Sequence, residues 1–122
     1  MSIVSSKTID PNEIEKFASI ADEWWDESGK FRPLHLFNPV RISYIRDSLI
    51  KHFGKDANSA KPLDGLELLD IGCGGGLLSE PLARLGANMT SIDASETNIK
   101  VASLHAEQSE LTIDYRNISS EQ

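Results

Sequence analysis

The sequence predicts an α/β fold that contains half of a doubly wound parallel sheet, and three observations support this prediction. Short apolar runs at residues 66–71, 87–92 and 111–115 are typical of strands. Helical patterns at residues 77–85 and 95–108 separate these runs, and strands that alternate with helices form parallel units with right-handed crossovers. A glycine-rich segment follows the first strand directly, as it does in ligand-binding sheets of this kind.

Two helices are expected before the sheet. Asp10 and Pro11 are typical of a helix N-cap and of the first helical position, and apolar residues follow at helical spacing up to Trp25. Residues 30–37 are expected to form an irregular link, and Asn38 to be the N-cap of a second helix. The chain then divides into a disordered tail (1–9), a helical leader (10–53), a linker (54–65) and the first half of a ligand-binding domain (66–122).

Composition narrows the classes of function. The 122 residues include 12 basic and 19 acidic side chains, a net charge of −7, which argues against a nucleic-acid partner. The single cysteine, Cys73, cannot form a disulfide within the chain, as is usual in a reducing compartment. No signal peptide and no run of roughly 18 apolar residues is visible. We therefore expect a cytoplasmic protein.

The segment Gly72-Cys73-Gly74-Gly75-Gly76 predicts that a ligand lies against bare main chain. A phosphate-binding P-loop is excluded, because the helix that follows begins without the required lysine. A dinucleotide motif matches Gly72 and Gly74, but Leu77 occupies the third small position, so this alternative is weakened and stays open. The third alternative is S-adenosylmethionine, which has no phosphate and needs a flat backbone turn with carboxylates beside it.

Two acids flank the glycine segment in the way the third alternative requires. Asp93 ends the second strand, about twenty residues after the first glycine, where an acid meets ribose hydroxyls in such units. Its other interpretation is a helix cap, a role that Ser95 can also fill. Asp70 directly precedes the turn. It is predicted to contact the ligand, to organise the loop by accepting backbone N–H groups, or to do both.

The segment LLDIGCGGGLLSEPLARLGANMTSIDAS resembles the first motif and the following acidic strand end of class I S-adenosylmethionine-dependent methyltransferases. The preceding EIEKFASIADEWWDESGKFRPLHLFNPVRISYIRD is similar to the leader of bacterial ubiquinone-biosynthesis O-methyltransferases, and VASLHAEQSELTIDY fits the same family. The resemblance covers residues 13 to about 117. It implies a Rossmann-like methyltransferase fold, of which this chain is expected to be the N-terminal part.

The resemblance also implies an activity and a set of contacts. The activity is methylation of a phenolic hydroxyl on a polyprenylated catechol, and the implied cofactor contacts are Arg41, Gly72 and Asp93. Arg41 suits the carboxylate of the cofactor because a guanidinium is a planar donor fork. The pattern of the turn adds Asp70 and Gly74 to this predicted cofactor site.

Several properties are not assigned by the sequence. The phenol must lose a proton to a base or with help from a divalent metal, but no metal-ligand cluster is visible. His35 is one candidate base, although a lone histidine near apolar residues is more often structural. Peripheral membrane contact beyond residue 122 and pairing with a second copy stay open. Two other functions also stay open: a nicotinamide-dependent oxidoreductase and a non-catalytic dimerising module.

Overall fold

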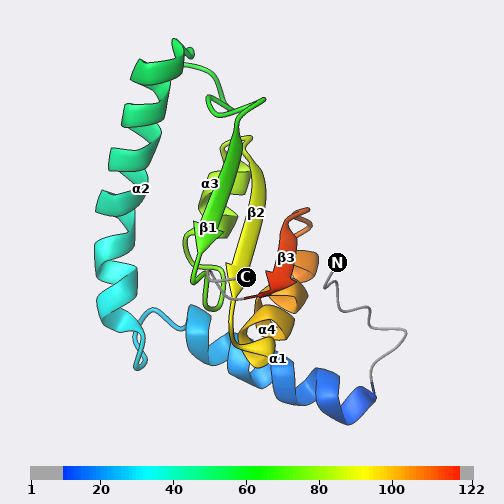
Figure 1. Cartoon of the computed structure of the whole chain (residues 1–122). Coiled ribbons are helices and arrows are strands. Elements are labelled where there is room, and N and C mark those ends of the chain that lie inside the picture. The colour runs from blue at the N-terminus through cyan, green and yellow to red at the C-terminus, as the bar shows by residue number, and fades with distance from the viewer. Residues whose placement is uncertain (1–9, 119–122) are drawn as a thin grey trace.

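A computed structural model describes residues 10–118 of the chain. The predicted disordered tail, residues 1–9, lies outside the described residues. The elements follow the order α1, α2, β1, α3, β2, α4, β3 (Figure 1). The α/β fold and the alternation of strands and helices after residue 66 are therefore confirmed.

The first helix, α1, spans Pro11–Trp25. The Asp10 side chain accepts a hydrogen bond from the Asn12 N–H at 2.7 Å, which confirms the predicted N-cap. The helix buries Phe17 and Ala21 against Val101 and Leu104 of α4 (Glu96–Gln108). A small second apolar cluster therefore connects the leader to the second half of the chain.

The second helix, α2, spans Arg32–Phe53, so its predicted start at Asn38 and the predicted irregular link were wrong. Pro33 lies in the first turn, where its missing N–H removes no intrahelical hydrogen bond. Pro39 lies inside the helix, which continues through it. Asn38 is instead a buried side chain that faces the rest of the molecule. In Figure 1 the helix extends along the β1 side of the sheet, and its N-terminal part adjoins the end of α1.

The sheet contains three parallel strands in the order β1-β2-β3 among the described residues. These are β1 (Glu67–Ile71), β2 (Asn88–Asp93) and β3 (Asp114–Asn117). The register pairs Glu67 with Asn88 and Ile71 with Ile92. Because parallel strands end at the same edge, this register brings Asp70 and Asp93 to the carboxyl end of the sheet.

The third strand begins later than predicted, because residues 111–113 precede the ladder. Ile113 and Tyr115, at alternate positions of the predicted run, are both buried. The short helix α3 (Ser79–Arg84) connects β1 to β2, and the Ser95 hydroxyl accepts from the Asn98 N–H as the predicted cap of α4.

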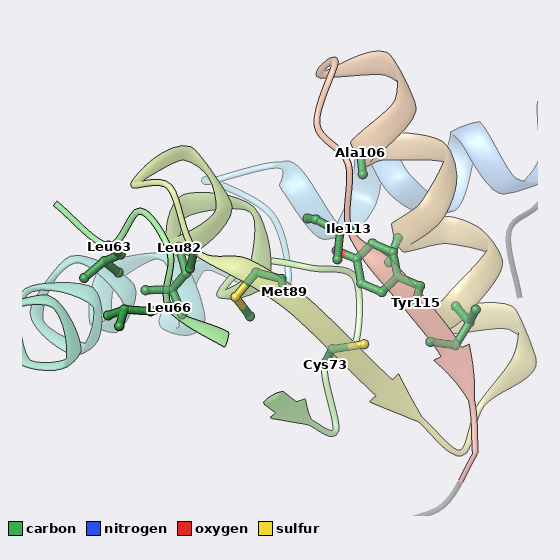
Figure 2. Packing of buried hydrophobic residues seen from close by; sticks show 11 residues of the cluster. Leu63, Leu66, Cys73, Leu82, Met89, Ala106, Ile113 and Tyr115 are labelled. Carbon is green, nitrogen blue, oxygen red and sulfur yellow. The ribbon is translucent and has the colours of Figure 1, made fainter. Parts of the chain in front are cut away.

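The main core lies between the sheet and the helices α3 and α4. Figure 2 shows Leu63, Leu66 and Leu82 at one end of this core, and Ile113 and Tyr115 at the other. Leu63 comes from the predicted linker, yet it is fully buried and its N–H donates to the Leu85 carbonyl at 2.9 Å. Within residues 10–118, none of the helices combines the length and apolar character that crossing a bilayer requires.

Candidate functional site

The glycine turn, residues 72–76, lies at the carboxyl end of β1. Gly72, Gly74 and Gly76 have φ values of 75°, 55° and 94°, in the left-handed region that residues with a side chain rarely adopt. The N–H groups of Gly72 and Cys73 both donate to the Ile92 carbonyl, at 2.8 and 3.0 Å. The turn is therefore fastened to the end of the neighbouring strand and has a fixed shape.

Asp93 organises both sides of this strand end. Its Oδ2 accepts a hydrogen bond from the Gly74 N–H at 2.9 Å, and its Oδ1 accepts from the Ser95 N–H at 2.8 Å. One carboxylate thus holds the glycine turn and the start of α4 in one arrangement. The loop-organising role that the sequence offered for Asp70 is filled by Asp93. A carboxylate oxygen has two lone pairs, so Oδ2 retains capacity for a ligand hydroxyl.

Asp70 has a different environment from Asp93. Its Oδ2 accepts from the Ser79 hydroxyl at 2.7 Å, and Ser79 also lies 2.7 Å from the Ser91 hydroxyl. Burial raises the pKa of Asp70, while the Ser79 hydrogen bond and the Arg41 charge partly oppose the rise. Asp70 is therefore a carboxylate short of positive partners, which suits it to accept a cationic ligand group.

The bare faces of the glycines are used in different ways. A Cβ added to Gly74 or Gly75 would lie 2.8 or 2.6 Å from the ring of Trp24, and one on Gly76 would lie 2.6 Å from the Tyr115 hydroxyl. A Cβ on Gly72 would meet nothing within 4 Å. Gly74 and Gly75 therefore leave room for the Trp24 ring, and Gly76 leaves room for the Tyr115 hydroxyl in the core. Open space lies only beside Gly72 among the glycines of the turn.

A cavity of about 180 Å³ opens at this position. It is lined by Trp24, Leu34, Arg41, Asp70, Gly72, Cys73, Gly74, Leu77 and Leu78. Four of the five predicted site residues meet here, and Asp93 is joined to them through its hydrogen bond to Gly74. The volume is below the roughly 300–1,000 Å³ of pockets that enclose a drug-sized ligand, so the cavity suits one end of such a molecule.

Arg41 reaches the cavity from α2. Its guanidinium donates to the Asn38 Oδ1 at 2.6 Å, and the Asn38 amide donates to the Leu77 carbonyl at 2.7 Å. The Arg41 Nε is buried and has no hydrogen-bond partner among residues 10–118. A buried guanidinium donor without a partner is costly, so an anionic group in the cavity would satisfy it.

Comparison with known proteins shows what this chain is similar to. The methyltransferase-domain family matches residues 69–122, which contain the glycine turn and Asp93. The ubiquinone biosynthesis O-methyltransferases of Chelativorans sp. (strain BNC1) and Parvibaculum lavamentivorans are 62% and 60% identical to this chain over 109 and 114 residues.

The similarity extends over only part of each relative's length. The aligned region covers 89% and 93% of this chain but only 43% and 45% of those two proteins. The chain thus spans about half the length of the curated relatives it matches.

Solved structures support the same methyltransferase fold. Magnesium protoporphyrin IX methyltransferase (ChlM) from Synechocystis PCC 6803, solved with bound SAM, matches with a TM-score of 0.60 at 21% identity. The match covers 94% of this chain and 57% of that one. The plantazolicin methyltransferase BpumL, solved with SAH, matches with a TM-score of 0.53 at 19% identity, covering 91% and 42%. At these identities the likeness establishes the fold.

Four side chains acquire clearer roles: His35, Cys73, Trp24 and Trp25. The His35 Nε2 lies 2.8 Å from the Trp24 carbonyl, a contact that ties α2 to α1 and favours the structural interpretation. Burial, followed by the charges of Asp70 and Asp93, raises the pKa of Cys73 to about 12, as expected of a packing residue. Trp24 lines the cavity, and the Trp25 Nε1–H donates to the Gly75 carbonyl at 3.2 Å.

Sequence reasoning missed the supporting side chains of the site. Asn38 was interpreted as a helix cap, but it connects Arg41 to Leu77. The contact of Trp24 with Gly74 has no local sequence signal, since the two residues are fifty positions apart. Among the described residues, no group of three or more His, Cys, Asp or Glu side chains is placed to hold a metal ion.

Proposed function

We propose that this chain is the N-terminal half of an S-adenosylmethionine-dependent O-methyltransferase of ubiquinone biosynthesis. The substrate we infer is a polyprenylated catechol, methylated on a phenolic hydroxyl. The support comes from relatives at 55–62% identity that carry this activity in their names. The matched methyltransferase domain supports S-adenosylmethionine over the nicotinamide alternative.

The observation that carries the proposal is the convergence of opposite charges on open main chain. Arg41 and Asp70 line one cavity together with Gly72 and Gly74, although they come from α2, β1 and the turn. The methionine end of the donor carries a carboxylate and an ammonium, and this cavity offers a guanidinium and a carboxylate. Its volume fits that end of the molecule rather than the whole of it.

Each residue then has a distinct role in binding. The unpartnered Nε–H of Arg41 would donate to the donor carboxylate, and Asp70 would accept from the ammonium. The open face of Gly72 would lie against the methionine chain. Asp93 would accept from the ribose hydroxyls mainly through Oδ2, which accepts only the Gly74 N–H, whereas Oδ1 already accepts from the Ser95 N–H and the Asn98 amide.

Methyl transfer requires mainly that the protein position the donor and the phenolic oxygen. S-adenosylmethionine supplies a methyl group that is already activated by its sulfonium. The residues of this chain hold the donor so that a phenolic oxygen can approach in line with the carbon–sulfur bond. The phenol must also lose its proton, to a general base or with a divalent metal. We place that function in the part of the relatives that this chain does not span.

The proposal also includes contact with a membrane and with a second copy of the chain. A polyprenylated substrate resides in a membrane, so we propose a cytoplasmic protein with peripheral membrane contact through the half that the relatives have in addition. Pairing with a second copy would be compatible with the three-stranded sheet, whose strand β1 exposes Leu69 and Ile71.

Calorimetric titration of the 122-residue chain with S-adenosylmethionine and with NAD tests the donor. We expect heat of binding with S-adenosylmethionine and none with NAD. Binding of NAD alone would contradict the proposal and favour an oxidoreductase. Binding of neither would favour the non-catalytic module for this chain.

A chimera tests the reaction. Residues 1–122 would be followed by the second half of the Chelativorans relative and supplied with a methyl-labelled donor and a short-chain prenylated catechol. Label in the phenolic ether is the expected product. A folded chimera that binds the donor but labels no phenol would contradict the proposed substrate class.

A further inference from the structure

A second group of polar side chains lies behind the glycine turn, outside the cavity. It consists of Trp25, His105 and Glu80, from α1, α4 and α3. The Trp25 ring stacks on the His105 ring with centroids 4.0 Å apart and planes 3° apart. The His105 Nδ1 lies 2.5 Å from the Glu80 Oε2. Three helices are thus connected through one chain of contacts.

Glu80 is the unusual member of this group, because its side chain is completely buried. A buried carboxylate is costly unless strong partners hold it. Arg84 provides only a long contact of 3.4 Å to its other oxygen, so His105 is its principal partner. Buried packing alone would be served better by an apolar residue, which indicates that the polar contact has a purpose.

Both ends of the chain of contacts reach the glycine turn. The Trp25 Nε1–H donates to the Gly75 carbonyl at 3.2 Å, and the Glu80 backbone N–H donates to the Gly76 carbonyl at 3.0 Å. The Trp25 side chain therefore holds one carbonyl of the turn, and the main-chain bond from Glu80 places its side chain directly after the turn. Trp24, the neighbour of Trp25, lies on the faces of Gly74 and Gly75.

We propose that Trp25, His105 and Glu80 are positioning residues for the methyl-donor site. They fix the orientation of the turn peptides and of the leader, so that Gly72 stays open while Trp24 closes over Gly74. None of the three lines the cavity, so they act through the turn. This inference rests on the proposed function.

Two variants test the positioning role. Trp25→Phe keeps an aromatic ring on His105 and removes the N–H that reaches Gly75. His105→Gln removes the ring and leaves a polar group near Glu80. Each should weaken S-adenosylmethionine binding about three- to tenfold, the equivalent of one lost hydrogen bond. His52→Gln is the matched control, since His52 is exposed on α2 and should leave the affinity unchanged.

Binding is measured by calorimetry at a temperature where circular dichroism shows that each variant is folded. A residue that only stabilises the fold would lower the melting temperature and leave the affinity of the folded protein intact. Unchanged affinity in folded Trp25→Phe would therefore overturn the proposal. If His105→Gln does not fold, Trp25→Phe decides the question alone.

A second measurement separates this proposal from the proposed function. In ¹⁵N-labelled protein without ligand, Trp25→Phe should shift the amide resonances of Gly75 and Gly76, and His105→Gln should shift the Trp25 indole resonance. Unchanged resonances would overturn the positioning role whether or not the chain binds the donor. Shifted resonances in a chain that binds no donor would refute the donor site and retain the link between leader and turn.

Discussion

The two walls of the cavity are built in different ways. On the sheet side, the wall is the main chain of Gly72 and Gly74 together with one short acid, Asp70, and hydrogen bonds hold the turn to the end of β2. On the leader side, it consists of long side chains, Trp24 and Arg41, that reach over from α1 and α2. The first wall comes from one stretch of the sequence, residues 70–74, whereas the second exists only when the leader has docked.

Glycine substitutions should distinguish the packing role of the turn from its ligand-binding role. They should also give the largest changes in stability. Gly76→Ala combines a φ of 94° with a Cβ 2.6 Å from the Tyr115 hydroxyl. It should lower the free energy of unfolding by about 2–4 kcal/mol. Gly72→Ala meets open space and should cost about 1–2 kcal/mol from backbone strain. Urea unfolding measures both.

Donor binding by Gly72→Ala and Gly76→Ala tests separately whether the two glycines have different roles. The Gly72→Ala methyl group would lie in the cavity, so this variant should lose donor affinity although it folds. Equal destabilisation of both variants, with equal loss of affinity, would contradict the distinct environments of the two glycines.

Arg41 tests the leader wall. Arg41→Lys retains the positive charge and loses the donor fork together with the Nε–H. Donor affinity should fall about tenfold or more, the scale of a hydrogen bond to a charged group. Arg46→Lys is the matched control, because Arg46 contacts Asp47 and the Ala57 carbonyl away from the cavity. Equal affinities of the two variants in calorimetry would remove Arg41 from the site.

The pH dependence of the melting temperature of Asp70→Asn tests the environment of Asp70 in the sheet-side wall. The pKa of Asp70 is raised in the folded protein, so its ionised form is disfavoured there relative to the unfolded chain. The protonated carboxyl of Asp70 therefore stabilises the folded wild type fully at pH values below 3.8, the usual pKa. This stabilisation is lost as the pH rises through the pKa that Asp70 has in the folded protein. Asp70→Asn should therefore melt higher than the wild type at pH 7, and this difference should vanish towards pH 3.

The same Asp70→Asn protein should bind the donor more weakly at pH 7, since the amide cannot pair with the ammonium. A melting temperature below that of the wild type at pH 7 would contradict the desolvated environment of Asp70. Scanning calorimetry from pH 3 to pH 8 makes the measurement.

Cys73 should show the smallest effect. With a pKa of about 12, roughly one thiol in ten thousand is ionised at pH 8. Alkylation of the folded protein should therefore be far slower than that of the chain unfolded in urea. Equal rates, followed by mass spectrometry, would show that the turn opens to solvent.

The difference between the walls also explains what the sequence could predict. The caps Asp10 and Ser95, the three strands and the glycine turn depend on neighbouring residues, so their patterns were visible. The start of α2 was misplaced because Asn38 before a proline is typical of a cap, while its buried contacts with Arg41 and Leu77 are tertiary. The pairing of Glu80 with His105 depends on the packing of α3 against α4.

The central claim is that the carboxylate of Asp93 binds the donor ribose at the end of β2. Asp93→Asn preserves the shape of the side chain and an acceptor for the Gly74 N–H, and Ser95→Ala removes only the cap of α4. Calorimetry with S-adenosylmethionine should show a loss of about tenfold or more for Asp93→Asn and none for Ser95→Ala. Unchanged donor affinity in folded Asp93→Asn would contradict the account.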